Sequence, residues 1–394
     1  MLPILELKSG RERSLNNKHP WIFSGAVKNL LTIETGTIIK VVDNKKTPIA
    51  YGFYDKQSQI VCKIFLFSNQ ELLIEYFDEQ FWFHKIQKAF MLRRELVLNE
   101  NTNCCRLLHA EGDEMPGVIA DIYNNAVVLQ ILHKGSEFIL DHIVASLNKL
   151  GFEYIYIKSK ESSKHIEYIS VASGWINKAL PQPIEVIENG CKFNVNVESG
   201  QKTGFFIDQR DNRLLVKTMS KGKTVLNAFS YTAGFSVYAA KGEAKHVVSV
   251  DISKDAIEAA NINMQLNNVD HIHVSKAEDC FKYLKDMEDN YYDLIILDPP
   301  AFAKSAKMVN NAARGYKEIN LMALKKIKEG GILFTYSCSK NIDRDLFRKI
   351  VFGAAADSGR TVQIIYQLTQ PSDHPISIYH PEGEYLKGLV LKVT

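Results

Sequence analysis

Residues 223–252 constrain the fold of this chain more than any other stretch of its sequence. A short apolar run at 224–228 is typical of a buried strand, and a loop of small and hydroxyl-bearing residues follows at 229–234. Helix-compatible spacing at 235–240 meets a stop at Gly242, and a second apolar run at 246–250 ends on Asp251. The stretch therefore predicts a strand, loop, helix and strand of an α/β domain.

Asp251 follows the first loop by about 20 residues, the spacing at which an acidic side chain accepts hydrogen bonds from ribose hydroxyls. The loop has no GxGxxG pattern, and Gly234 is its one glycine. Without the glycines that cradle a diphosphate, NAD and a dehydrogenase are disfavoured, whereas S-adenosylmethionine has no phosphate to hold. An ordinary βαβ unit without a ligand is the alternative that this stretch leaves open.

Length and charge limit the remaining choices. A chain of 394 residues has room for two or three domains, and a net charge of +3 means that any RNA-binding surface must be local. The sequence has no apolar run long enough to span a membrane, and its N-terminus lacks the layout of a signal peptide. Six cysteines without a CxxC pair argue against structural zinc, so we predict no metal and a cytoplasmic location.

Three domains are predicted along the chain. Strand-like runs at 36–43, 48–54 and 60–67 indicate a small β-barrel over residues 1–72. Before them, cations at 8–23 are interleaved with His19 and Trp21, which suits either an RNA contact or a solvated loop anchored by the tryptophan.

A helical pattern at 77–99 opens the second predicted domain, a linker helix and a middle α/β domain over 73–185. Lys85, Lys88, Arg93 and Arg94 give this helix a basic face, for solvent or for RNA. Residues 186–394 form the third predicted domain, which contains the chemistry.

The strongest local signal is the end of an apolar strand at 292–297, where Asp298 is followed by two prolines. Prolines cannot continue a central ladder, so they stiffen the backbone at the carboxyl end of the strand, where open α/β sheets bind ligands. A rigid carboxylate beside Phe302 can bond the edge of a planar base while the ring stacks on its face.

The next predicted strand, at 332–336, brings Cys338 to the same edge of the sheet. A cysteine at a strand end is usually a small buried hydrophobe. This one is predicted to lie within reach of Asp298, with Lys340 nearby to favour the thiolate.

With these residues assembled, the chain resembles the bacterial class I 23S ribosomal RNA cytosine-C5 methyltransferases that carry an N-terminal PUA domain. The resemblance covers nearly the whole chain. It implies a PUA β-barrel, a middle α/β domain and a Rossmann-like methyltransferase domain with a seven-stranded sheet. The motifs that carry it are HPWIFSGAV (19–27), RLLHAEGDEMPGVIAD (106–121), GQKTGFFIDQR (200–210), VLNAFSYTAGFSVYAA (225–240), LDPPAFAKS (297–305), LFTYSCS (333–339) and EYLKG (384–388).

The resemblance also implies S-adenosylmethionine as the methyl donor, covered by residues 202–210. The acidic turn at 277–280 leaves the adenine contact open between Glu278 and Asp279, and Lys340 departs from the family pattern. The residues predicted to contact the donor are Thr203, Phe206, Arg210, Asn227, Phe229, Tyr231, Gly234, Asp251, Asp279 and Asp298.

The predicted activity is the formation of 5-methylcytosine in 23S ribosomal RNA. Cys338 would attack C6 of the base and Asp298 would bond N3, whereas the sequence names no base for the C5 proton. The target must be unpaired or flipped from its stack. Two alternatives stay open: an RNA N-methyltransferase that uses Asp298 without a nucleophilic cysteine, and a non-catalytic RNA-binding assembly factor. Nothing in the sequence decides between a monomer and a homodimer.

Overall fold

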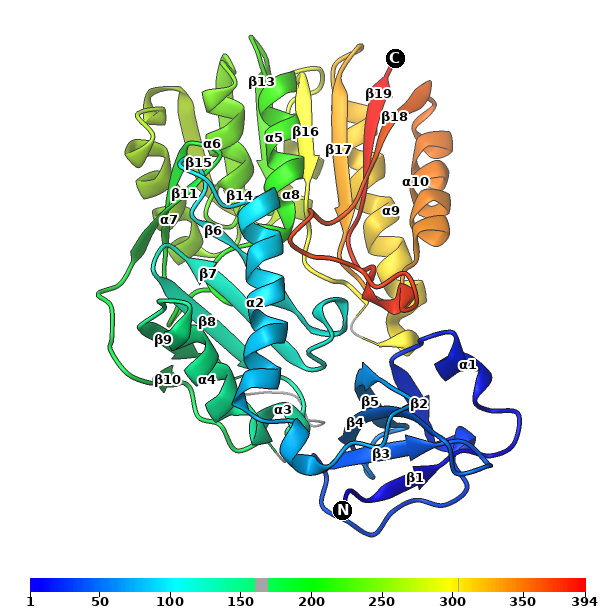
Figure 1. Cartoon of the computed structure of the whole chain (residues 1–394). Coiled ribbons are helices and arrows are strands. Elements are labelled where there is room, and N and C mark those ends of the chain that lie inside the picture. Colours follow the sequence, from blue (N-terminus) through cyan, green and yellow to red (C-terminus); the bar gives the residue numbers. More distant parts are fainter. Residues whose placement is uncertain (160–168, 304) are drawn as a thin grey trace. The chain divides into compact units, whose positions relative to one another are not determined.

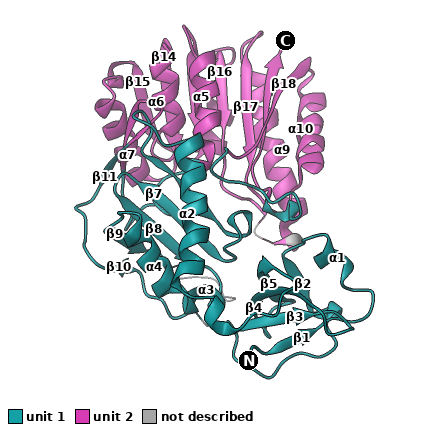
Figure 2. Cartoon of the chain, in the orientation of Figure 1, with its two compact units in different colours: residues 1–186, 195–207, 372–383 teal, residues 187–194, 208–371, 384–394 magenta. Residues whose placement is uncertain are grey.

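The computed structural model describes residues 1–159, 169–303 and 305–394 of the chain, so Lys304 of the LDPPAFAKS motif lies outside the described residues. The chain forms two compact units (Figure 2). Unit 1 comprises residues 1–186, 195–207 and 372–383, and unit 2 comprises residues 187–194, 208–371 and 384–394.

The N-terminal part of unit 1 is a five-stranded sheet in the order β1-β3-β4-β5-β2 (Figure 1). The strand predictions at 48–54 and 60–67 are confirmed to the residue. Leu5, Ile39 and Val61 are among the side chains that fill its core. Its elements are β1 (Ile4–Glu6), α1 (Arg13–Asn16), β2 (Trp21–Phe23), β3 (Ile38–Val42), β4 (Pro48–Tyr54) and β5 (Ile60–Phe67).

The rest of unit 1 is built on a second five-stranded sheet, in the order β10-β9-β8-β7-β6. Asp78 begins the long helix α2 by accepting a hydrogen bond from the Phe81 N–H (2.9 Å), and Trp82 of that helix packs into a core shared with Phe53 and Phe65 of the first sheet. The elements are α2 (Glu79–Leu96), β6 (Cys104–His109), β7 (Val118–Tyr123), β8 (Ala126–Ile131), α3 (Lys134–Phe138), α4 (Leu140–Lys149), β9 (Tyr154–Ile157) and β10 (Gly174–Trp175).

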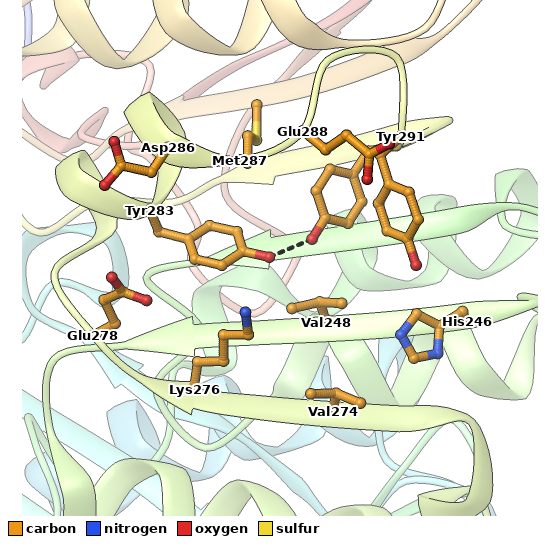
Figure 3. A pocket seen from close by; sticks show the side chains of 11 residues that line it. His246, Val248, Val274, Lys276, Glu278, Tyr283, Asp286, Met287, Glu288 and Tyr291 are labelled. Carbon is orange, nitrogen blue, oxygen red and sulfur yellow. Dashed lines mark hydrogen bonds between the residues drawn. The ribbon is translucent and has the colours of Figure 1, made fainter.

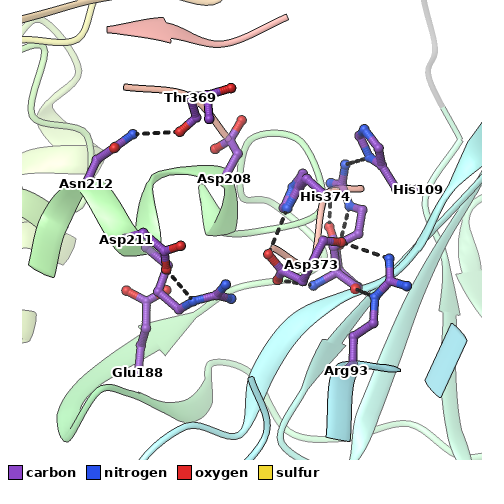
Figure 4. Close-up of polar contacts among 12 residues, drawn as sticks. Arg93, His109, Glu188, Asp208, Asp211, Asn212, Thr369, Asp373 and His374 are labelled. Atoms are coloured by element: carbon purple, nitrogen blue, oxygen red, sulfur yellow. Dashed lines mark hydrogen bonds and ion pairs between the residues drawn. The ribbon is translucent and has the colours of Figure 1, made fainter. Parts of the chain in front are cut away.

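Arg93 of α2 ties the distant segment 372–383 into unit 1 (Figure 4). The side chain is fully buried, and its guanidinium donates to both carboxylate oxygens of Asp113 (2.6 and 2.7 Å) and to the Asp373 carbonyl (2.9 Å). The Arg106 N–H in turn donates to the Asp373 carboxylate (2.9 Å). The prediction that Arg93 lies on an exposed basic face is therefore wrong, because helix periodicity does not reveal a buried carboxylate from elsewhere in the chain.

Unit 2 contains a seven-stranded sheet in the order β15-β14-β13-β16-β17-β19-β18 (Figure 1). Neighbouring strands are parallel from β15 to β17, and β19 is antiparallel to both of its neighbours. The helices pack in two groups, α5 with α6 and α7, and α8 and α10 with α9. This is the predicted Rossmann-like arrangement, in which helices bury both faces of a largely parallel sheet.

The helices and strands in this part of the chain occur in the predicted order. A hairpin of β11 (Ile184–Glu188) and β12 (Cys191–Val195) comes first. The remaining elements are α5 (Arg210–Met219), β13 (Thr224–Ala228), α6 (Gly234–Lys241), β14 (His246–Asp251), α7 (Lys254–Leu266), β15 (His273–Ala277), α8 (Cys280–Asp286), β16 (Leu294–Leu297), α9 (Val309–Lys326), β17 (Ile332–Ser337), α10 (Arg344–Ser358), β18 (Val362–Leu368) and β19 (Lys387–Val393).

Register brings the chemically interesting strand ends to one edge of this sheet. Ala228 at the end of β13 pairs with Val250 of β14 and with Leu297 of β16, and Leu297 pairs with Thr335 of β17. Because these strands are parallel, the residues that follow them emerge at the same carboxyl edge.

Helix α9 begins at Val309, although Asn310, Asn311 and Gly315 in its first turns have low helix propensity. A Cβ atom at Gly315 would lie 3.3 Å from the Phe302 ring, so this glycine makes room for the ring. Within the described residues, none of the helices combines the length and the apolarity that crossing a membrane requires.

Candidate active site

The loop after β13 has an unusual backbone. Three non-glycine residues in it, Phe229, Tyr231 and Ala233, have left-handed φ angles of 60°, 46° and 63°. Non-glycine residues rarely adopt this backbone conformation, so the surrounding contacts must stabilise the loop. A loop held this firmly is typical of a ligand-binding turn in an α/β fold.

Hydrogen bonds inside unit 2 occupy most N–H groups of this loop. Four of them donate as follows: Phe229 to the Cys280 sulfur (3.2 Å), Ser230 to the Val250 carbonyl (3.0 Å), Tyr231 to the Asp251 carboxylate (2.9 Å) and Ala233 to the Ser230 carbonyl (2.9 Å). A diphosphate needs such groups to be available, as they are in a glycine-rich loop. The loop therefore fits a ligand without phosphates.

Asp251 lies half-buried at the end of β14, as the sequence predicts. Its two carboxylate oxygens accept hydrogen bonds from the N–H groups of Tyr231 (2.9 Å) and Ser253 (3.0 Å). Each carboxylate oxygen has a second lone pair, so the fixed carboxylate can also accept hydrogen bonds from ribose hydroxyls. The residues present thus fit the nucleoside part of S-adenosylmethionine.

Asn227 and Gly234, both predicted to contact the donor, have structural partners. Asn227 is 1% exposed and donates to the Ser236 hydroxyl of α6 (2.9 Å). A Cβ atom at Gly234 would lie 3.2 Å from the Arg213 side chain, which forms a buried ion pair with Glu188 (2.8 and 2.7 Å). These contacts account for the Asn227 amide nitrogen and for the small residue at position 234, whereas the buried Asn227 Oδ1 has no hydrogen-bond partner among the described residues.

Asp279 and Glu278 follow β15, and both contact Lys282, Asp279 at its backbone N–H and Glu278 at its ammonium group (3.4 Å). Asp279 is exposed and begins α8 by accepting from the Lys282 N–H (2.9 Å). Glu278 lines a groove of about 490 Å³ along β14 and β15 (Figure 3).

The groove holds a pair of tyrosines, Tyr283 and Tyr292, whose hydroxyls are 2.5 Å apart, and the Lys276 ammonium lies 4.9 Å from the Tyr283 ring (Figure 3). Apart from Glu278, its lining residues lie on β14, β15 and α8 and in the segment 287–292. They do not include Asp251, Asp298 or Cys338.

The 202–210 segment is divided between the units. Thr203 and Phe206 belong to unit 1 and Arg210 to unit 2. The Thr203 hydroxyl is buried and bonds Asp121 (2.5 Å) and Tyr123 (2.8 Å), and the Lys202 ammonium lies 4.2 Å from the Phe206 ring. Arg210 is buried at the start of α5 and contacts Asp211 (3.2 Å). Their role toward the donor stays a prediction.

Asp298 and Cys338 follow neighbouring strands, β16 and β17. The Cys338 sulfur lies 4.0 Å from the carbonyl oxygen of Pro299, the residue after Asp298. Both side chains are half-buried, whereas the other five cysteines are buried. The structure thus brings the predicted sulfur to the predicted proline-stiffened loop.

Ser339 holds these two loops together. Its hydroxyl accepts from the Ala303 N–H (3.2 Å), five residues beyond Asp298, and bonds the Tyr316 hydroxyl (2.9 Å). Phe302 is partly buried, with ring-centre distances of 4.6 Å to Tyr316 and 6.0 Å to Phe281. This packing fixes the relative position of the carboxylate and the sulfur.

Tyr336 of β17 lies beneath this edge of the sheet, with its ring stacked on Phe235 at 5.6 Å. Burial raises its pKa well above the usual value, and the negative charge of Asp298 adds to that effect. The tyrosine therefore stays protonated, and its hydroxyl is a buried group without a hydrogen-bond partner among the described residues.

Lys387 is a buried lysine at this site that the sequence pattern did not reveal. It begins β19 opposite Ser337, is 3% exposed, and donates to the carbonyl oxygens of Ser339 and Tyr385 (both 2.8 Å). Burial lowers its pKa to about 8. Lys340, which the sequence suggested instead, is exposed. A lysine at a strand start looks like a solvated residue, and the EYLKG motif was the only signal for it.

Residues 1–159, 169–303 and 305–394 contain no group of three or more His, Cys, Asp or Glu side chains placed to hold a metal ion.

Comparison with known families identifies two regions of the chain. Residues 106–378 match the model of an S-adenosylmethionine-dependent methyltransferase, and residues 5–67 match the model of a PUA-like domain. The first match covers more than half of the chain and agrees with the observed seven-stranded fold.

Full-length relatives are similar throughout. "Ribosomal RNA large subunit methyltransferase I" of Shewanella denitrificans is 41% identical over 397 residues, covering 99% of each chain. The protein of the same name from Shewanella amazonensis is 40% identical over 395 residues, again covering 99% of each.

Two solved structures have the same fold over their whole length. A putative SAM-dependent methyltransferase from Streptococcus mutans has a TM-score of 0.84, with 25% sequence identity and 100% coverage of both chains. A putative methyltransferase complexed with SAH has a TM-score of 0.86 at the same identity and coverage.

Proposed function

We propose that this chain, which belongs to the S-adenosylmethionine-dependent methyltransferases and, among them, to the ribosomal RNA large subunit methyltransferase I family, forms 5-methylcytosine in 23S ribosomal RNA. The observation that supports this specificity most is the half-buried Cys338 sulfur, 4.0 Å from the proline-stiffened loop that carries Asp298. Transfer to an exocyclic or ring nitrogen would need no such nucleophile.

S-adenosylmethionine, the donor of this family, supplies an electrophilic methyl group when it is bound. Asp251 would hold its ribose, because its carboxylate is already oriented by two backbone N–H groups. Phe229, Tyr231, Asp279 and Asp298 are proposed to line the rest of the donor site, together with Thr203, Phe206 and Arg210. Contacts from Asn227 and Gly234 would be indirect, through α6 and Arg213.

Cys338 solves the problem that cytosine C5 is a weak nucleophile. The thiolate forms an S–C6 bond, and the electron pair of the C5–C6 double bond makes C5 able to attack the methyl group. After the new C–C bond forms, a base removes the C5 proton. The electrons of that C–H bond restore the C5–C6 double bond as the S–C6 bond breaks, so the thiolate returns unchanged.

Asp298 would support the same step from the opposite side of the ring. Negative charge grows at N3 when the sulfur adds to C6, so a proton or hydrogen bond supplied there stabilises the transition state. The two prolines after Asp298 and the Ser339 bridge to Ala303 limit its movement. A carboxylate that is fixed in place stabilises the transition state more than a mobile one, because it need not reorient during the reaction.

Residues 1–72 are proposed as the RNA-binding PUA module and residues 73–185 as the middle domain. The match to a PUA-like domain supports the first assignment. The target cytosine has to leave its stack to reach a thiolate and a methyl donor, so we propose a single-stranded or loop segment of the ribosomal RNA as the substrate.

Adduct trapping tests the covalent mechanism directly. Fluorine at C5 cannot be removed as a proton, so RNA containing 5-fluorocytidine should stay bonded to the enzyme after methyl transfer and run with it in a denaturing gel. We expect a trapped complex with the native chain and with Cys62→Ala, whose cysteine is buried in the barrel, but none with Cys338→Ala. Methyl transfer by Cys338→Ala to C5 would contradict the mechanism.

Nucleoside analysis of the product separates the alternatives. An N-methylated base that still forms with Cys338→Ala would favour the RNA N-methyltransferase, in which Asp298 alone positions the substrate. Failure to bind S-adenosylmethionine in calorimetry would favour a non-catalytic assembly factor.

A further inference from the structure

Lys387 is buried, whereas a lysine in a strand usually extends into solvent. It pairs with Ser337 in the ladder between β17 and β19, one residue before Cys338. Its ammonium donates to the carbonyl oxygens of Ser339 and Tyr385 (both 2.8 Å). Both of these partners are carbonyl oxygens, so no carboxylate among the described residues neutralises the ammonium charge in a direct ion pair.

We propose that Lys387 is a positioning residue for Cys338, which fixes the chain that carries the sulfur and holds a buried positive charge beside it. The proposal rests on the covalent mechanism above and deepens it, because it names the group that prepares the nucleophile. It acts through Cys338 and through the Ser339 carbonyl, and it needs no contact with the RNA.

The charges around Lys387 support this assignment. Burial is the largest influence on its pKa and lowers it, and the nearby Cys338 is the largest of the influences that favour the charged form. Glu384 and Asp343 favour the charged lysine as well, and Arg344 opposes it. By reciprocity, a positive Lys387 favours the negative form of Cys338.

Two other described groups near the sulfur, Tyr316 and Lys340, differ from Lys387. Tyr316 of α9 faces Cys338, and burial raises the pKa of this tyrosine, so it stays neutral. Lys340 is exposed, and water and salt screen an exposed charge far more strongly than a buried one. Of the two lysines, the buried Lys387 should therefore have the larger effect on the thiolate equilibrium.

Alkylation of Cys338 by iodoacetamide measures that equilibrium without any RNA. The other five cysteines are buried, and Cys338→Ala gives the background rate. We expect Lys387→Met to move the midpoint of the rate–pH profile upward by about one pH unit, and so to slow alkylation about tenfold near neutrality. Lys387→Arg should stay near the native profile, because it keeps the charge.

Two further variants make the test specific. Lys392→Met removes a lysine from the far end of the same strand, about 17 Å away, and should leave the profile unchanged. Lys340→Met should shift the midpoint of the alkylation profile by less than about a third of the shift caused by Lys387→Met. If Lys387→Met does not fold, as judged by its thermal unfolding, Lys387→Gln replaces it in the comparison with Lys387→Arg.

The outcomes separate this inference from the proposed function. An unchanged alkylation profile in a folded, uncharged Lys387 variant overturns the inference even if Cys338 is the nucleophile. A shifted profile, with C5 methylation retained by Cys338→Ala, supports the pairing of the lysine with the sulfur but overturns the covalent mechanism. A shift of equal size in Lys387→Arg would show that packing, and not charge, is responsible, and would also overturn the inference.

Discussion

Both units bury long cationic side chains, and two of these, Arg93 in unit 1 and Lys387 in unit 2, are compensated in different ways. Arg93 in unit 1 is 0% exposed and forms a two-point ion pair with Asp113, together with hydrogen bonds to two carbonyl groups. Lys387 in unit 2 is 3% exposed, and the structure gives it two carbonyl oxygens and a nearby sulfur.

The difference teaches how to separate a structural charge from a functional one. A buried charge with a matched partner gains enough Coulomb energy and hydrogen bonding to offset desolvation, and it serves mainly to fix a unique packing. A buried charge without a carboxylate partner has a shifted pKa and remains available to influence a neighbouring group. Arg93 fits the first description and Lys387 the second.

Breaking the ion pair in unit 1 should have the largest effect. Arg93→Met leaves the Asp113 carboxylate buried without its partner, and we expect the free energy of unfolding to fall by about 3–5 kcal/mol. Urea denaturation followed by circular dichroism measures the loss. Arg94→Met, on the exposed side of the same helix, is the matched control and should change stability by less than about 0.5 kcal/mol. Equal losses in both variants would contradict the assignment.

The pH dependence of stability should sharpen the contrast. The pKa of Lys387 is lowered to about 8 in the folded chain from an ordinary 10.5, so the unfolded chain binds more protons between these values. The native chain should therefore gain roughly 2–4 kcal/mol relative to Lys387→Met as the pH rises through that window.

Denaturation of both chains at about pH 7 and about pH 10 measures this linkage. At the lower pH the variant should be no less stable than the native chain, apart from its lost hydrogen bonds, since it no longer buries a charge. Arg93→Met provides the comparison, because an arginine stays charged across the whole range. A native chain that loses stability relative to Lys387→Met on going to high pH would refute this description of the lysine.

Asp251 is the intermediate case, a half-buried carboxylate held by two backbone N–H groups. Asp251→Asn removes the charge and replaces one acceptor with a donor, so we expect S-adenosylmethionine to bind about 10-fold to 100-fold more weakly. Calorimetric titration measures the affinity. Asp255→Asn, an exposed acid in the first turn of α7, should bind the donor as the native chain does. Unchanged binding by Asp251→Asn would remove the ribose contact from the proposal.

Particular residues show where sequence reasoning succeeded and where it stopped. The apolar runs before Asp251 and Asp298 predicted two buried strands, because a buried strand needs continuous apolar side chains. Both strands lie in the parallel part of one sheet, on either side of β13. Arg93 was assigned to an exposed face because its partner, Asp113, lies 20 residues away on a separate element. Local periodicity contains no information about such a partner.

The amino-acid sequence by itself determined the order of the elements, the Rossmann-like sheet and the three residues on which the proposed chemistry is built, Asp251, Asp298 and Cys338. Strand patterns and proline positions act over a few residues, so they can be read directly from the chain. Tertiary structure alone decided that Lys387 is buried beside the sulfur, that Ser339 bridges two loops, and that Asn227 faces a helix. Burial and charge coupling depend on which distant segments pack together, and that is decided when the sheet closes with β19 beside β17.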